Sequence, residues 1–163
     1  MSNTNSETQK ATFGAGCFWG VEVTFATVPG VLDTEVGYEG GQLSEPTYKD
    51  VCTDSTGHAE VVELTFDPGQ VNYSALLDTF FSLHDPTQLN RQGPDTGTQY
   101  RSVIFYHSPE QEAEAKQKIE ELTAAKRFAK PIETRVVPAE TFWPAEDYHQ
   151  RYLAKRGLAS CHI

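Results

Sequence analysis

The order of apolar patterns along the chain is the feature that most limits its fold. Short alternating runs predict strands, and runs with apolar residues three or four positions apart predict helices. In the first two thirds of the chain the predicted order is strand, helix, strand, followed by strand, helix, strand. The six segments are 11–16, 17–28, 31–41, 58–66, 72–85 and 100–107. This order predicts an α+β domain, a ferredoxin-like split βαβ two-layer sandwich.

The last third of the chain predicts additions to that core. Ser108 and Pro109 begin a long helix whose acidic residues come first and whose basic residues come last, as expected of a solvated helix. A strand at 132–139, a short helix at 145–156 and a C-terminal tail follow. We therefore expect extra C-terminal helices and a long C-terminal tail.

Length and composition favour one soluble domain. At 163 residues, we expect a disordered tail at 1–10 and a single domain at 11–163, in which 154–163 form a mobile tail. No apolar run approaches the roughly 20 residues of a membrane span, and the first ten residues do not resemble a targeting peptide. The net charge of −10 disfavours nucleic acid and anionic membranes. We expect a cytoplasmic monomer that acts on a small molecule or a protein.

Three cysteines, Cys17, Cys52 and Cys161, stand far apart in the sequence. An odd number with these spacings is a poor disulfide framework and matches no zinc motif, so we expect no metal. Reactive thiol chemistry in a reducing compartment is one interpretation. The alternative is that each thiol is a small apolar residue.

The segment GAGCFWGVE places Cys17 between a predicted strand and a predicted helix. Unpaired N–H groups and the positive dipole end at a helix N-terminus favour a thiolate, which makes Cys17 the best candidate nucleophile. The next two residues, Phe18 and Trp19, are costly to leave exposed and indicate a binding partner. The alternatives are a thiol that fills the junction and aromatic rings that belong to the core.

Several loop residues could give protons to a developing oxyanion: Tyr48, Glu60, Asp95 and Tyr100. Glu60 falls on the more apolar side of the strand at 58–66, where removal from water disfavours its charged form. The alternative for Glu60 is an ion pair with Arg101 or Arg135. A cysteine-histidine hydrolase has no supporting motif here.

Six segments together resemble peptide methionine sulfoxide reductase A, the type specific for the S epimer. The resemblance spans about residues 13–163. The segments are GCFWG, GYEGG, PTYKDVC, TGHAEVVE, HDPTQLNRQGPDTGTQYRS and FWPAEDYHQRYL.

The resemblance implies a peptide-methionine (S)-S-oxide reductase in which Cys17 attacks the sulfoxide sulfur. Phe18 and Trp19 would form an apolar pocket for the substrate methyl group, and Gly16 and His58 would also line the substrate site. The substrates would be oxidised methionine in proteins and free methionine sulfoxide. No metal or organic cofactor is implied.

By the same resemblance, Glu60 would give a proton to the departing oxygen, to which Tyr48 and Tyr100 would donate hydrogen bonds. Asp95 would shape the polar wall of the site. Two rival functions remain open on the residues alone: a thiol peroxidase, and a non-catalytic module that binds methionine-containing peptides.

Recycling would use the C-terminal tail. Attack on the sulfoxide leaves Cys17 as a sulfenic acid, which Cys161 would convert to a disulfide for reduction by thioredoxin. Cys52 belongs to a motif whose cysteine is not the usual resolving residue, and we interpret it as structural. Many relatives carry a second recycling cysteine in a glycine-rich tail, whereas the tail here has one, so we expect a two-cysteine cycle.

Overall fold

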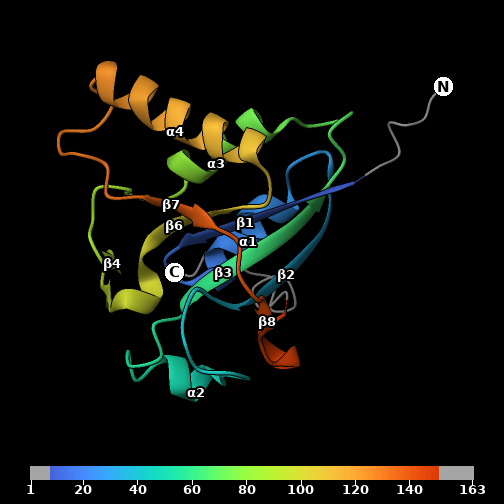
Figure 1. The fold of residues 1–163 in the computed structure, drawn as a ribbon, viewed down its shortest axis with the longest axis vertical. Coiled ribbons are helices and arrows are strands. Elements are labelled where there is room, and N and C mark those ends of the chain that lie inside the picture. The colour runs from blue at the N-terminus through green and yellow to red at the C-terminus, as the bar shows by residue number, and fades with distance from the viewer. Residues whose placement is uncertain (1–7, 151–163) are drawn as a thin grey trace.

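The computed structural model describes residues 8–150, which contain a six-stranded sheet flanked by helices (Figure 1). Neighbouring strands are antiparallel except β6 and β7, which are parallel. In spatial order the strands are β7 (Arg135–Pro138), β6 (Ser102–Tyr106), β1 (Gln9–Ala15), β3 (Ala59–Phe66), β2 (Val31–Glu39) and β8 (Trp143–Pro144).

The central order β6-β1-β3-β2, with a helix after β1 and another after β3, is that of a split βαβ sandwich. The α+β, ferredoxin-like expectation is therefore confirmed. A separate two-stranded hairpin joins β4 (Arg91–Gln92) and β5 (Asp95–Thr96). The helices are α1 (Phe18–Ala26), α2 (Tyr48–Val51), α3 (Tyr73–Ser82) and α4 (Pro109–Ala124), with single 3-10 turns η2 (Thr98–Tyr100) and η3 (Asp147–His149).

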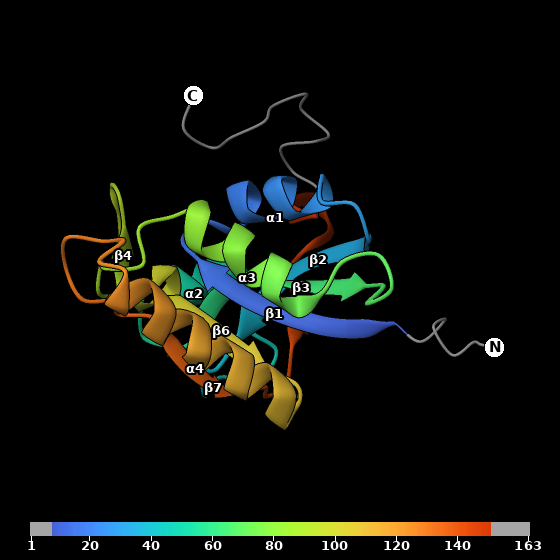
Figure 2. The same ribbon diagram turned by 90° about the horizontal axis from the view of Figure 1, so that it is seen from above.

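Helices α1 and α3 lie over the same face of the sheet, and α4 packs beside α3 (Figure 2). The main core fills this layer, where the ring of Phe13 from β1 stacks on Phe25 of α1 at 5.2 Å and on Phe80 of α3 at 5.1 Å. All three side chains are fully buried. These rings therefore pack β1 against α3 and against the last turn of α1.

The opposite face of the sheet carries a smaller apolar cluster of Ala59, Val61, Val103 and Phe105. The side chain of Phe142 packs against this cluster. The alternation along β3 and β6 assigns odd-numbered residues to this face and even-numbered residues to the helix face. Both strands therefore present side chains to two different environments, the helix layer and the smaller cluster.

Helix boundaries follow local capping chemistry. Asn72 accepts a hydrogen bond from the Ala75 amide at the start of α3, and Ser108 accepts one from the Gln111 amide at the start of α4. Pro109 occupies the first turn of α4, as the sequence predicts.

Three segments differ from the sequence-based expectations. The polar stretch 42–57, expected as a loop, contains the short helix α2, which a capping box between Thr47 and Asp50 stabilises. The helix expected at 145–156 is a single 3-10 turn within the described residues. Strand β1 begins at Gln9, inside the segment assigned to the N-terminal tail.

The remainder of the predicted helix and the tail at 154–163, including Cys161, lie outside the described residues. Within residues 8–150, no helix is both long enough and apolar enough to cross a membrane.

Candidate active site

Cys17 occupies the N-cap position of α1, where the chain leaves β1, and its side chain is partly exposed. Gly16 makes the turn possible because its φ of +94° is strained for residues with a side chain. A Cβ at Gly16 would also come within 2.9 Å of the Gln92 side chain. The turn therefore needs glycine both for its backbone and for the close approach of the β4 strand. The expectation that Cys17 begins a helix is confirmed.

Glu60 lies beside the first turn of α1, although 42 positions separate it from Phe18. Its Oε1 accepts a hydrogen bond from the Phe18 backbone amide at 3.2 Å, and its side chain is only 1% exposed. Glu60 pairs with Tyr38 across β2 and β3, which places both residues on the helix face of the sheet. The carboxyl group is thus held at the backbone amide of the residue that follows Cys17.

Tyr48 and Tyr100 reach the same region from α2 and η2. Burial, and next the nearby Glu60 carboxyl, raise the pKa of each phenol above its ordinary value of 10. The nearby Cys52, Asp95 and Cys17 groups add to the rise in the pKa of Tyr100. Both tyrosines are therefore protonated hydrogen-bond donors at neutral pH.

Cys52 is the C-cap of α2 and is exposed, and its backbone amide donates a hydrogen bond to the Tyr48 carbonyl oxygen at 2.9 Å. Partial burial of the Cys52 thiol raises its pKa, and the carboxyl groups of Glu60 and Glu146 act in the same direction. Cys52 is therefore a neutral thiol at neutral pH.

Phe18 and Trp19 differ in exposure. Phe18 is 1% exposed, and its ring lies 5.8 Å from the ring of Tyr38 and 6.3 Å from that of Tyr48. Trp19 is half-buried, and its indole N–H donates a hydrogen bond to His149 Nδ1 at 2.9 Å. The two rings thus form part of an aromatic group that spans α1, β2, α2 and η3.

His58 lies at the start of β3 and is 2% exposed. Its Nδ1 accepts a hydrogen bond from the Gly41 amide at 3.0 Å, and its Nε2 donates to the Leu43 carbonyl oxygen at 2.7 Å. Both ring nitrogens are therefore used to hold the loop after β2 against the strand that carries Glu60.

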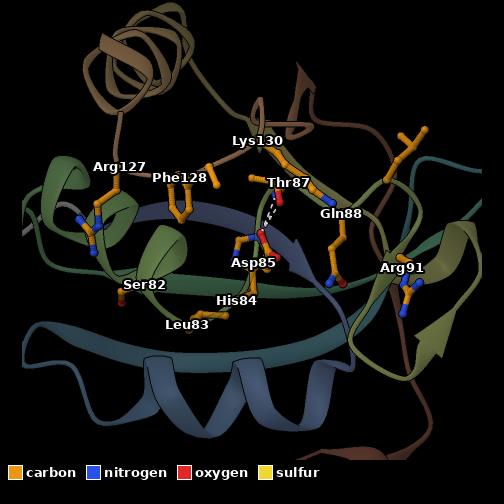
Figure 3. A pocket seen from close by; sticks show the side chains of 12 residues that line it. Ser82, Leu83, His84, Asp85, Thr87, Gln88, Arg91, Arg127, Phe128 and Lys130 are labelled. Carbon is orange, nitrogen blue, oxygen red and sulfur yellow. Dashed lines mark hydrogen bonds between the residues drawn. The ribbon is translucent and has the colours of Figure 1, made fainter. Parts of the chain in front are cut away.

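A large pocket lies away from the residues described so far. A pocket of about 830 Å³ lies between the C-terminal end of α3, the loop that follows it, and the segment after α4. Figure 3 shows the side chains that line it. His84, Asp85, Arg127 and Lys130 are among its lining residues, and the candidate catalytic residues are not. Among the described residues, this pocket is therefore separate from the thiol, the carboxyl group and the two phenols.

Three residues at or beside the aromatic group were not singled out from the sequence: Tyr38, His149 and Glu146. Glu146 Oε1 accepts a hydrogen bond from the Tyr38 hydroxyl at 2.9 Å, and its Oε2 accepts one from the Tyr48 amide at 2.9 Å. The available signal was the position of Glu146 and His149, three residues apart, in the segment FWPAEDYHQRYL.

Comparisons with known proteins agree along nearly the whole chain. The family model for peptide methionine sulfoxide reductase matches residues 9–163. MsrA of Acidobacterium capsulatum is 70% identical over 154 residues, which cover 94% of this chain and 99% of the relative. MsrA of Geobacter sulfurreducens is 61% identical over 157 residues, which cover 96% of this chain and 97% of the relative.

Solved structures give the same result. Mxr1 of Saccharomyces cerevisiae in its reduced form is 37% identical with a TM-score of 0.88, covering 93% of this chain and 87% of that chain. Methionine sulfoxide reductase A of Corynebacterium diphtheriae is 39% identical with a TM-score of 0.84, covering 97% and 80%. The fold and these matches define an oxidoreductase that acts on oxidised sulfur. More narrowly, the chain belongs to the peptide methionine sulfoxide reductase family and is an enzyme of the MsrA type, a peptide-methionine (S)-S-oxide reductase.

Proposed function

We propose that Cys17 is the nucleophile of this reductase and that Glu60 is its proton donor. The Cys17 sulfur attacks the sulfoxide sulfur and forms an S–S bond while Glu60 gives a proton to the oxygen. The S–S bond and the substrate S–O bond then break as the hydroxyl passes to the Cys17 sulfur, which leaves a sulfenic acid on Cys17 and releases methionine. The hydrogen bond from the Phe18 amide to Glu60 carries the proposal, because it holds the carboxyl group beside the thiol. Removal from water disfavours a charged carboxyl group, so Glu60 is suited to hold the proton.

Tyr48 and Tyr100 would stabilise the sulfoxide oxygen as negative charge develops on it. Their raised pKa values keep both hydroxyl groups protonated, which makes them permanent donors. Asp95 lies near Tyr100 and would form the polar wall behind it.

Phe18 and Trp19 would hold the substrate methyl group, since apolar walls are typical of small-molecule sites. Free and peptide-bound sulfoxide present the same methyl group to this pocket, so both are proposed as substrates. Gly16 would contribute by shaping the turn, and His58 by holding the neighbouring loop.

Recycling is proposed to use Cys161, which lies outside the described residues. Condensation of the Cys17 sulfenic acid with the Cys161 thiol releases water and forms a disulfide, which thioredoxin would reduce by thiol exchange. In support, yeast Mxr1 has also been crystallised in complex with Trx2. This chemistry suits a monomer in a reducing compartment such as the cytoplasm, where the enzyme would repair oxidised proteins under oxidative stress.

Mass spectrometry after one equivalent of methionine sulfoxide tests this cycle. The wild-type protein should lose two hydrogens and yield one linked peptide pair containing Cys17 and Cys161. Cys17→Ser should form no methionine, and Cys161→Ser should form about one methionine per enzyme and then stop. Repeated turnover by Cys161→Ser with thioredoxin as the sole reductant would refute the resolving role. Consumption of hydrogen peroxide without consumption of sulfoxide would instead indicate a thiol peroxidase.

A further inference from the structure

The segment Ala145–Gln150 joins separate parts of the active-site region. The Gln150 side chain binds both the amide and the carbonyl oxygen of Val36 at 2.9 Å, and so continues the edge of β2 as a further strand would. Glu146 binds the Tyr38 hydroxyl and the Tyr48 amide. The ends of the segment are therefore fixed to β2 and α2, and His149 lies between these anchors.

His149 is fully buried, and its ring lies 5.2 Å from Phe18, 5.6 Å from Trp19 and 4.4 Å from Tyr48. The indole N–H of Trp19 can only donate, so His149 Nδ1 must be the unprotonated acceptor of their 2.9 Å hydrogen bond. The proton of the neutral ring then sits on Nε2, 3.9 Å from Glu146 Oε1. One tautomer of one buried ring thus fixes the direction of the indole.

We propose that His149 is a positioning residue of the methyl pocket, where it orients the Trp19 indole by accepting its N–H. This inference rests on the proposed function, in which Phe18 and Trp19 hold the substrate methyl group. His149 acts through Trp19 and needs no contact with the sulfoxide. Without an acceptor, the half-buried indole loses the hydrogen bond that selects one orientation, and the pocket wall is no longer fixed before substrate binds.

The proton state of His149 is set by the groups around it. The charged or titratable groups that face it are Glu146 and Tyr148 from its own segment and Tyr48 from α2, while α1 presents the uncharged rings of Phe18 and Trp19. Burial lowers the pKa of His149, although the Glu146 carboxylate opposes the change. A protonated ring carries hydrogen on both nitrogens and cannot accept from Trp19, so the contact requires the neutral form.

Two substitutions test separately the hydrogen-bond acceptor and the aromatic ring of His149. His149→Phe keeps an aromatic ring and removes the acceptor, whereas His149→Asn removes the ring and keeps an acceptor oxygen near the position of Nδ1. We expect His149→Phe to raise KM for a methionine sulfoxide peptide about three- to tenfold, the range for one lost hydrogen bond, with kcat within about twofold. We expect His149→Asn to restore KM to within about twofold of wild type. An unchanged KM in His149→Phe, or equal losses in both variants, would overturn the proposal.

A fluorescence titration tests the contact without relying on catalysis. The chain has two tryptophans, Trp19 and Trp143, so Trp143→Phe leaves Trp19 as the sole reporter. Its emission should change as His149 is protonated in mild acid, and the change should vanish when His149→Asn is added. Persistence of the same titration in His149→Asn would contradict the contact. If the protein were inactive, this measurement would still report on His149, so a failure of the proposed function and a failure of this inference can be distinguished.

Discussion

Two buried glutamates on adjacent strands, Glu39 and Glu60, lie on opposite faces of the sheet. Both are at most 1% exposed. Glu60 pairs with Tyr38 and faces the helix layer, whereas Glu39 pairs with Ala59 and faces the smaller cluster. Their residue type, burial and strand pair are the same, and their surroundings differ.

The contacts of the two carboxyl groups separate a catalytic candidate from a structural one. Glu60 accepts from the first amide of α1, beside Cys17. Glu39 Oε2 accepts from the Glu140 amide at 2.8 Å, in the chain that covers the other face. Burial raises the pKa of Glu39 to about 7, and the carboxyl groups of Glu63 and Glu140 add to the rise. A perturbed carboxyl group is thus a poor sign of function unless it faces a reacting group.

The largest effect on kcat should come from replacing Glu60, and the same replacement at Glu39 is the matched control. Glu60→Gln should lower kcat by about 100- to 10,000-fold, the range for loss of a general acid, because glutamine cannot release a proton to the oxygen. Glu39→Gln should leave kcat within about twofold. Steady-state rates on a methionine sulfoxide peptide, with circular dichroism to verify folding, measure both. Comparable losses of kcat in the two variants would remove the distinction between the two faces.

The pH dependence of stability should report on Glu39. With its pKa raised from 4.5 to about 7, the folded state binds a proton that the unfolded state releases. Its stabilising effect is complete below pH 4.5 and is lost as pH rises through 7. The loss is about 3 kcal/mol at about 1.4 kcal/mol per pKa unit. From pH 4.5 to 7 the wild type should lose about 3 kcal/mol of stability relative to Glu39→Gln, and urea denaturation of both proteins at several pH values measures this difference.

His84 should act with the opposite sign and a similar size. Burial lowers its pKa from 6.5 to about 4, while Nδ1 donates to the Phe80 carbonyl oxygen at 2.7 Å and Nε2 accepts from the Ser102 hydroxyl at 2.8 Å. The unfolded state therefore binds the proton first, and stability falls by about 3 kcal/mol as pH drops from 6.5 to 4. Between pH 4.5 and 6.5 the two effects oppose one another.

Urea denaturation of His84→Gln checks this cancellation. The substitution removes the acid-side loss, so the variant should show the decline due to Glu39 over pH 4.5–7 more steeply than the wild type does. The slope is the readout, because the substitution also lowers stability at every pH by disturbing the buried hydrogen bonds. An unaltered slope would mean that His84 does not titrate as its burial requires.

Local patterns predicted the four central strands β1, β2, β3 and β6, the helices α1, α3 and α4, and the local placement of Cys17 and Glu60. Alternation along 58–66 assigned Glu60 to the apolar face, and the glycine-flanked junction placed Cys17 at a helix start. Both assignments depend on neighbours within a few positions, which a sequence displays directly.

Contacts between distant segments could not be predicted in this way. The hydrogen bond between Trp19 and His149 joins residues 130 positions apart, and the pairing of Tyr38 with Glu60 requires the register of β2 on β3. Helix α2 has only four residues and therefore no apolar period, although Thr47 and Asp50 carry its capping signal. Packing and register determine these features, and local sequence holds little of either.

The smallest predicted effect comes from Gly16→Ala. This substitution tests whether the sheet face that carries Glu60 can be disturbed without changing the face that carries Glu39. Gly16→Ala places a Cβ at a φ of +94° and within 2.9 Å of Gln92, and should cost about 2 kcal/mol of stability. Gly93→Ala is the matched control, because Gly93 also has a positive φ, +59°, and no atom lies within 4 Å of the added Cβ. It should cost about 1 kcal/mol, from backbone strain alone.

The decisive readout is again the slope of stability against pH. Gly16→Ala shifts the turn that sets the thiol and the first amide of α1 on the helix face of the sheet. Glu39 and its bond to the Glu140 amide lie on the other face, so the slope of stability against pH between 4.5 and 7 should equal that of the wild type. A changed slope in Gly16→Ala would show that the two faces respond together, and the catalytic and structural carboxyl groups could then no longer be treated as independent.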